Sequence, residues 1–229
     1  MIKFFLGILL TILIIIGGIY YAVLGVGAKD LGIKVTPQDS ELSRTKAGME
    51  IISINSQDGK LDFTLEGKKD MEFSMDSQEL TALANNRPWK NYPVKNIQIK
   101  IYPDGTIESS GILIVSRTIP YAVSLGYSES QVKQAIQKYN LPSFEIPFYL
   151  IGTGSVTNDN VSVNASSAKI GLVPIPANIV SQANQEAEQL LNNLISKHSQ
   201  SFHAETITFT DGKVNFKGYV PEKEYVQTE

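Results

Sequence analysis

An uninterrupted apolar run, residues 4–28, constrains this chain more than any other feature of its sequence. The run carries no charge, and at about 1.5 Å per residue a helix of this length spans a hydrocarbon core about 30 Å thick. It is longer than the apolar part of a secretory signal, and only a weak small-x-small site, residues 26–28, lies at its end. The sequence therefore predicts a membrane anchor over residues 1–29, with a cleaved signal peptide as the alternative.

The charges that flank the run indicate its orientation. Lys3 and the free amine precede it, whereas Lys29 is followed directly by Asp30. Positive charge favours the cytoplasmic side of a membrane span. We therefore expect a single-pass protein of the cell membrane, with a cytoplasmic N-terminus and an extracytoplasmic C-terminal domain.

The rest of the chain has the length and composition of one folded domain. We expect this domain over residues 30–220, followed by a polar C-terminal tail over residues 221–229. The formal net charge is −3, without a run of more than two adjacent basic residues, which argues against nucleic acid or anionic lipid headgroups as the main partner. The sequence contains no cysteine, which excludes disulfides, thiol catalysis and thiolate metal sites.

Four stretches of alternating apolar and polar sequence are each interrupted by residues that tolerate positive φ. The expected turns are at residues 58–59, 103–105, 158–160 and 211–212. The expected strands beside them are 52–54 with 61–65, 97–101 with the segment from 107, the segment up to 156 with 161–163, and 207–209 with 214–216. Such patterns are typical of β-hairpins whose strands have one buried face, and an extra strand is expected near residues 71–75.

Helical segments are expected between the hairpins. N-terminal capping patterns begin at Thr36, Asp76 and Ser128, and Gly48 is expected to end the first of these helices. The longest helix is predicted over residues 177–197 because its apolar residues recur at three- and four-residue spacing. The stripe expected to face the sheet includes Ile179, Ala183, Leu190 and Leu194.

These elements predict an α+β fold. The expected architecture is an N-terminal transmembrane helix followed by a curved, mainly antiparallel β-sheet of about eight strands. Helices, including the long amphipathic one, are expected to pack against this sheet.

Few residues suggest catalysis or metal binding. His198 and His203 would need a third ligand, for which Glu205 is the nearest candidate, and two solvated histidines are the simpler interpretation. Ser130 and Lys133 match the S-x-x-K pattern of acyl-enzymes, but neither of its companion motifs follows. We therefore expect a protein that is not an enzyme and that has no catalytic residues, metal site or cofactor.

Three segments, residues 112–115, 144–151 and 170–176, carry more apolar residues than a one-sided sheet needs. Pro147 is expected to keep the second segment away from the centre of the sheet. Helices could bury both faces of these strands, or the segments could line an apolar groove or form a membrane-facing rim. The candidate lining of such a groove is Ile112, Ile114, Phe144, Phe148, Leu150, Ile175 and Leu191.

The anchor, the L-T-A-L helix at residues 80–83 and the D-G turns are arranged as in a known family. Together with the hairpin DGKVNFKG at residues 211–218, they resemble bacterial YpmS/LmeA-type single-anchor envelope proteins. The resemblance implies a lipid-binding-like fold, a curved antiparallel sheet around a long helix, and transfers no functional residue. The expected function is binding of a lipid or other apolar ligand at the cell envelope. The alternative is an envelope scaffold or assembly protein that binds a protein partner through an apolar patch.

Overall fold

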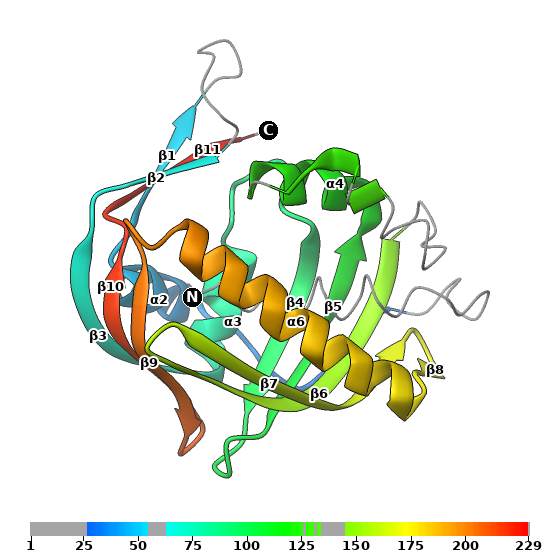
Figure 1. The fold of residues 1–229 in the computed structure, drawn as a ribbon. Coiled ribbons are helices and arrows are strands. Elements are labelled where there is room, and N and C mark those ends of the chain that lie inside the picture. Colours follow the sequence, from blue (N-terminus) through cyan, green and yellow to red (C-terminus); the bar gives the residue numbers. More distant parts are fainter. Residues whose placement is uncertain (1–26, 55–62, 126, 131, 134–144, 229) are drawn as a thin grey trace.

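The computed structural model describes residues 27–54, 63–125, 127–130, 132–133 and 145–228. The predicted anchor lies almost wholly outside these residues, and none of the helices described is long and apolar enough to cross a membrane. The described residues form an α+β fold with four helices, a mainly antiparallel eight-stranded sheet and a small mixed sheet (Figure 1).

The elements have the following bounds. The helices are α2 (Pro37–Ala47), α3 (Ser77–Asn85), α4 (Val115–Ser124) and α6 (Ala177–Lys197). The larger sheet contains β3 (Lys69–Asp76), β4 (Val94–Ile101), β5 (Ile107–Ile114), β6 (Glu145–Thr157), β7 (Asn160–Ile170), β8 (Val173–Pro174), β9 (His203–Thr210) and β10 (Lys213–Val220). The smaller sheet contains β1 (Glu50–Ile54), β2 (Phe63–Glu66) and β11 (Lys223–Gln227).

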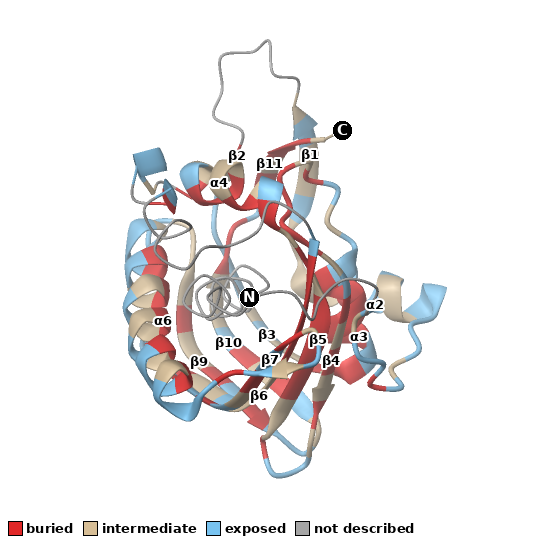
Figure 2. Cartoon of the chain, turned by 90° about the vertical axis from the view of Figure 1, so that its right-hand side faces the viewer, coloured by how far each residue is buried: buried red, intermediate tan, exposed pale blue. Residues whose placement is uncertain are grey.

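Strand β6 is the centre of the larger sheet, whose order is β3-β10-β9-β6-β5-β4, with β7 on the other edge of β6. A bulge between Ile151 and Gly152 shifts its register with β7. A Cβ at Gly152 would lie 2.6 Å from the carbonyl oxygen of Asn164, so only glycine allows this close approach. The sheet is curved, and apolar side chains on its inner face form part of the core (Figure 2).

Three of the four predicted hairpins are confirmed. They are β4–β5, β6–β7 and β9–β10, all antiparallel. The turn of β6–β7 places Asn158 and Asp159 at φ 47° and 65°, and the turn of β9–β10 places Asp211 and Gly212 at 53° and 74°. These are the positive φ values that the turn residues had predicted.

The first predicted hairpin is wrong, because β1 and β2 do not pair with each other. Strand β11 lies between them, parallel to β1 and antiparallel to β2. The expected turn, residues 58–59, lies outside the described residues. The same strand corrects the expectation of a polar tail over residues 221–229, since Glu224 and Val226 are fully buried.

Pro147 was expected to keep its segment away from the centre of the sheet. This expectation is wrong, because Pro147 lies within the central strand β6. Its carbonyl accepts from the N–H of Gly171 at 2.8 Å, just beyond Phe148, the first residue of β6 in register with β7. The N–H that proline lacks therefore belongs to the end of the β6–β7 ladder and not to its middle. The apolar run 112–115 is also divided, because β5 ends at Ile114 and α4 begins one residue later.

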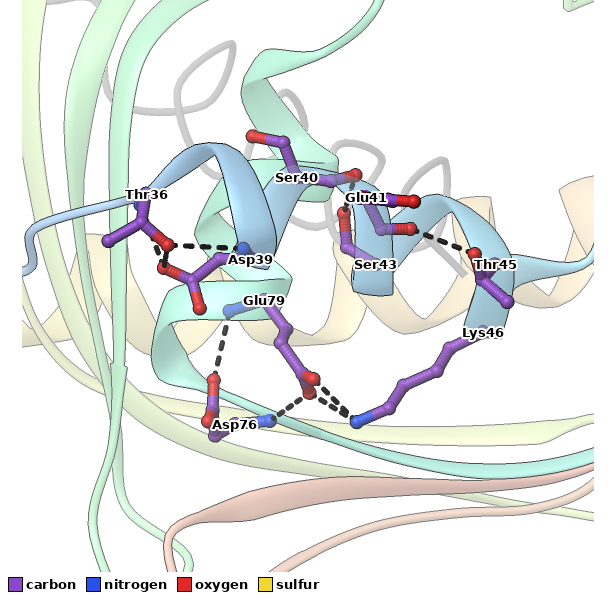
Figure 3. Close-up of polar contacts among 9 residues, drawn as sticks. All are labelled: Thr36, Asp39, Ser40, Glu41, Ser43, Thr45, Lys46, Asp76 and Glu79. Carbon is purple, nitrogen blue, oxygen red and sulfur yellow. Dashed lines mark hydrogen bonds and ion pairs between the residues drawn. The ribbon is translucent and has the colours of Figure 1, made fainter.

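Helices α2 and α3 begin at the predicted capping boxes (Figure 3). The hydroxyl of Thr36 accepts from the N–H of Asp39 at 3.2 Å, and the Asp39 carboxylate accepts from the N–H of Thr36 at 2.7 Å. Asp76 and Glu79 form the same reciprocal pair at 2.9 and 3.1 Å. Lys46 then donates to both carboxylate oxygens of Glu79 at 2.6 Å, which joins the two helices. The pattern predicted from Ser128 extends into residues outside the described part.

Helix α3 closes the open edge of β4 with side chains spaced four residues apart. The helix residues are Ser77, Thr81 and Asn85, and their strand partners are Ile101, Ile99 and Ile97. The three strand N–H groups donate to the side-chain oxygens at 2.9, 2.9 and 3.0 Å in that order. Four helix residues rise about 6 Å and two strand residues about 6.6 Å, so the two repeats stay in step over three contacts.

Helix α6 closes the edge of β7 in the same way. The helix residues are Asn184, Glu188 and Asn192, and their strand partners are Ala165, Val163 and Val161. The strand N–H groups donate to these side chains at 2.9, 2.9 and 2.8 Å in that order. Neither edge therefore presents its row of N–H groups to another chain.

The predicted bounds of α6, residues 177–197, are confirmed. Of the predicted stripe, Ala183 and Leu194 are buried, whereas Ile179 and Leu190 are half-buried. Leu191, rather than Leu190, is the large residue of this turn that is fully buried, at 1% exposure. The helix thus faces the core with an apolar row and β7 with a polar row.

Candidate functional site

An apolar cavity of about 90 Å³ lies beneath the C-terminal half of α6. Helices α2 and α3 and strands β2, β3, β10 and β11 supply the rest of its wall. Its apolar lining is Ala47, Met49, Leu65, Phe73, Leu83, Leu191, Leu194, Ile195, Phe202, Val220 and Pro221. Three polar side chains complete it: Arg87, His198 and Glu224.

A buried ion pair between Arg87 and Glu224 forms the polar part of this wall. The two side chains are only 3% and 0% exposed. Burial alone would lower the pKa of Arg87, but the adjacent carboxylate raises it, so the guanidinium stays charged. Burial also raises the pKa of both Tyr92 and Tyr121 near the pair, which keeps these phenols neutral.

Aromatic side chains pack around the pair. Phe63 stacks on Trp89 with ring centroids 5.3 Å apart, and Trp89 contacts Tyr121 at 4.9 Å. The edge of His198 meets Phe63 at 6.0 Å. Trp89, which is unusual in a loop, is therefore a core residue at 2% exposure.

Some buried polar atoms near the cavity have no hydrogen-bond partner in the described part of the chain. They include Nε of Arg87, Nε1 of Trp89 and the hydroxyl of Tyr121. Buried donors are nearly always paired, so the lack of an acceptor in the described part of the chain is unusual for these atoms. Arg87 is the one of the three that borders the cavity.

The structure divides the residues that were expected to line a groove. Leu191 borders the cavity, while Phe148, Leu150 and Ile175 lie elsewhere in the core or against it. Ile112 and Ile114 stand opposite Pro147 and Glu145, in the alternate register to the core residue Leu113. These two isoleucines therefore lie on the outer face of the sheet and do not border this cavity. Phe144 is outside the described residues.

Pattern reasoning missed Arg87 and Glu224 altogether. Arg87 follows α3 in a segment that reads as a polar loop, and Glu224 falls in the expected tail. Their pairing joins residues 137 positions apart, a distance at which no local spacing rule applies.

The second histidine and the lysine of the S-x-x-K pattern each pair with an acid in the described part of the chain. His203 pairs with Asp159 at 2.6 Å, and Lys133 pairs with Glu129 at 2.6 Å. Within the described residues, no group of three or more His, Asp or Glu side chains could hold a metal ion.

Comparison with protein families, with curated proteins and with solved structures found no match.

Proposed function

We propose that this protein is not an enzyme and that it binds a lipid or other apolar ligand at the cell envelope. The observation that carries the proposal is the apolar cavity beneath α6 with the buried Arg87–Glu224 pair in its wall. An apolar lining with a few convergent polar groups is typical of small-molecule sites. Binding of such a ligand needs a hydrophobic wall and one hydrogen-bond donor, and it needs no catalytic group.

The size of the cavity limits what it can hold. An apolar cavity of about 150 Å³ accommodates one benzene ring, and sites for drug-sized ligands start at about 300 Å³. The 90 Å³ beneath α6 fits a short stretch of one hydrocarbon chain and not a whole lipid. We propose that the end of an apolar chain enters the cavity and that a ligand oxygen accepts from Nε of Arg87.

We further propose that residues 4–28 anchor the chain in the membrane, with residue 29 onward outside the cytoplasm. The uncharged run and the preceding Lys3 support this topology. Protease added to intact cells is expected to degrade the C-terminal domain. Protection of the domain until the membrane is lysed would contradict the topology.

Native mass spectrometry tests the ligand. The full-length chain, extracted from its own cells, is expected to retain a bound apolar molecule that lipid analysis identifies. Ala47→Leu places a larger side chain in the cavity wall and is expected to remove this molecule. Ala177→Leu, at the exposed start of α6, is the matched control and is expected to retain it.

An empty wild-type protein that also fails to bind added lipids of several classes would refute ligand binding. The alternative, a scaffold that binds a protein through an apolar patch, would then be favoured. The most exposed large apolar residues of the described part, Val35, Leu42, Val123 and Leu172, are spread over several elements, which favours the ligand.

A further inference from the structure

The chain is fastened to the outer face of the sheet directly after the apolar run. Lys29 donates to the carboxylate of Glu108 at 2.7 Å, and its ammonium lies 3.9 Å from the ring centre of Tyr149. Tyr149 also donates to Glu108, and Tyr102 donates to the second carboxylate oxygen at 2.7 Å. Two residues, Gly27 and Ala28, therefore separate this attachment from the residues outside the described part.

These contacts hold Glu108 in its charged form. Burial alone would raise the pKa of Glu108, but the hydrogen bonds from Lys29, Tyr149 and Tyr102 outweigh it and lower the pKa to about 2. Glu108 is therefore charged at neutral pH.

The next residues stay on the same face. The backbone N–H groups of Leu31 and Ile33 both donate to the side-chain oxygen of Gln98, at 2.7 and 3.3 Å. Leu31 is buried at 8% exposure. Figures 1 and 2 both place this segment, which leads into α2, outside the curved sheet and away from α6.

Strand register gathers lysines around this attachment. Lys100 stands opposite Glu108, and Lys169 stands opposite Tyr149, so both lie on the outer face with Lys29. The ammonium groups of Lys100 and Lys169 lie within 6 Å of the ring centres of Tyr102 and Tyr149, at 5.2 and 5.7 Å. We call Lys29, Lys100, Lys169, Tyr102 and Tyr149 the outer lysine–tyrosine cluster.

Two acids, Glu108 and Asp30, lie beside the three lysines of the cluster and leave a net charge of +1. Glu108 is already paired with Lys29, and Asp30 accepts from the N–H of Gly32 at 2.8 Å. Leu172, the most exposed large apolar residue of the described part at 69%, follows three residues after Lys169. Lysine and tyrosine beside an exposed apolar side chain is a composition suited to a membrane interface.

We propose that the outer lysine–tyrosine cluster lies against the anionic headgroups of the membrane that holds the anchor. This inference rests on the proposed anchorage by residues 4–28. Lys29 directly follows the proposed anchor and is attached to strands β5 and β6, so no flexible linker separates the anchor from the sheet. The membrane surface must therefore lie close to this face. Lysine ammonium groups complement anionic lipids.

The absence of cysteine makes a labelling test direct. The full-length chain is reconstituted into vesicles of phosphatidylcholine with and without phosphatidylglycerol, each containing a nitroxide-headgroup lipid. A fluorophore is attached to Ser167→Cys, two residues before Lys169 on the same face. The control label is on Gln200→Cys, an exposed site beyond the C-terminus of α6.

We expect several-fold stronger quenching at residue 167 than at residue 200, with a further increase when phosphatidylglycerol is present. Lys100→Gln with Lys169→Gln is expected to remove that increase, whereas the charge-matched pair Lys68→Gln with Lys223→Gln is expected to keep it. Equal quenching at both sites in a chain that resists alkaline carbonate would overturn the inference alone. Release of the chain by carbonate would overturn the anchorage as well.

Discussion

At two edges of the sheet, a helix supplies side-chain acceptors for the N–H groups of the edge strand, and the two edges use different side chains. Along β4, the ladder from α3 begins with two buried hydroxyls, Ser77 and Thr81. Along β7, the ladder from α6 uses half-buried amides and the carboxylate of Glu188. The spacing is the same in both, so the difference lies in how far each edge is shielded from water.

Burial explains the choice of acceptor. A carboxylate that loses its water must be compensated by strong partners, whereas a hydroxyl is inexpensive to bury once it is hydrogen-bonded. Glu188 accepts a single backbone N–H at 2.9 Å and keeps contact with solvent. The comparison predicts that the β4 edge is sensitive to the loss of one oxygen and that the β7 edge is tolerant.

The largest effect is expected from Thr81→Val, which keeps the shape and removes the hydroxyl. The N–H of Ile99, now at 2.9 Å from that oxygen, would be buried without an acceptor, and the Ile99 carbonyl would lose its donor. We expect the free energy of unfolding to fall by about 3 kcal/mol, measured by denaturant titration of the full-length chain in detergent. Thr45→Val in exposed α2 is the control, and equal losses in both variants would refute the argument from burial.

A smaller loss of stability is expected at acid pH, where the carboxylate of Glu108 becomes protonated. The folded pKa of Glu108 is about 2, below its ordinary value of 4.5, so its contribution is complete above pH 4.5 and is lost as the pH falls towards 2. With allowance for the half-exposed Lys29, we expect a loss of about 2 kcal/mol across this window. Glu108→Gln should flatten the pH profile. An unchanged profile in this variant would show that Glu108 is not the source of the acid sensitivity.

A loss of about 1 kcal/mol is expected from Glu188→Ala. The N–H of Val163 loses its acceptor, but water can reach this half-buried edge and replace it. Glu186→Ala is the matched control, because that carboxylate accepts from the side chain of Gln182 instead of from the strand. Thermal unfolding of both variants measures the difference, and a loss as large as that of Thr81→Val would remove the contrast between the edges.

The smallest effect is expected from Glu188→Gln, whose amide oxygen can still accept from Val163. We expect the free energy of unfolding to change by less than about 0.5 kcal/mol. A clear loss would mean that the negative charge itself, rather than an acceptor, stabilises this edge. The measurement is the same denaturant titration.

Local patterns predicted those elements whose partners lie nearby in the chain. The capping box at Thr36, the turn at Asn158 and the bounds of α6 were all visible in the sequence, because each depends on residues a few positions apart. Strand β11 was not predictable, because its alternation is short and its partners lie in β1 and β2. Helix α4 was missed because it contains Pro120 and has no side-chain cap.

The candidate site was predicted far less well than the fold. Of the six proposed lining residues that the structure describes, Leu191 alone borders the cavity, because surplus hydrophobicity does not say which face of a strand a residue occupies. Ile112 and Ile114 show the limit, since one step of register moves a side chain to the opposite face. Arg87 and Glu224 carry no local signal, and only the tertiary fold brings them together.

The position of β11 has a consequence for biogenesis. Strands β1 and β2 appear early during synthesis, but the strand that pairs with both is translated on the order of 10–30 s later at ordinary ribosome speeds. Until then Arg87 has no counter-charge, and a buried ion left without its partner costs about 3–5 kcal/mol. A chain interrupted before residue 223 would therefore lack both the strand that joins β1 to β2 and the counter-charge of Arg87.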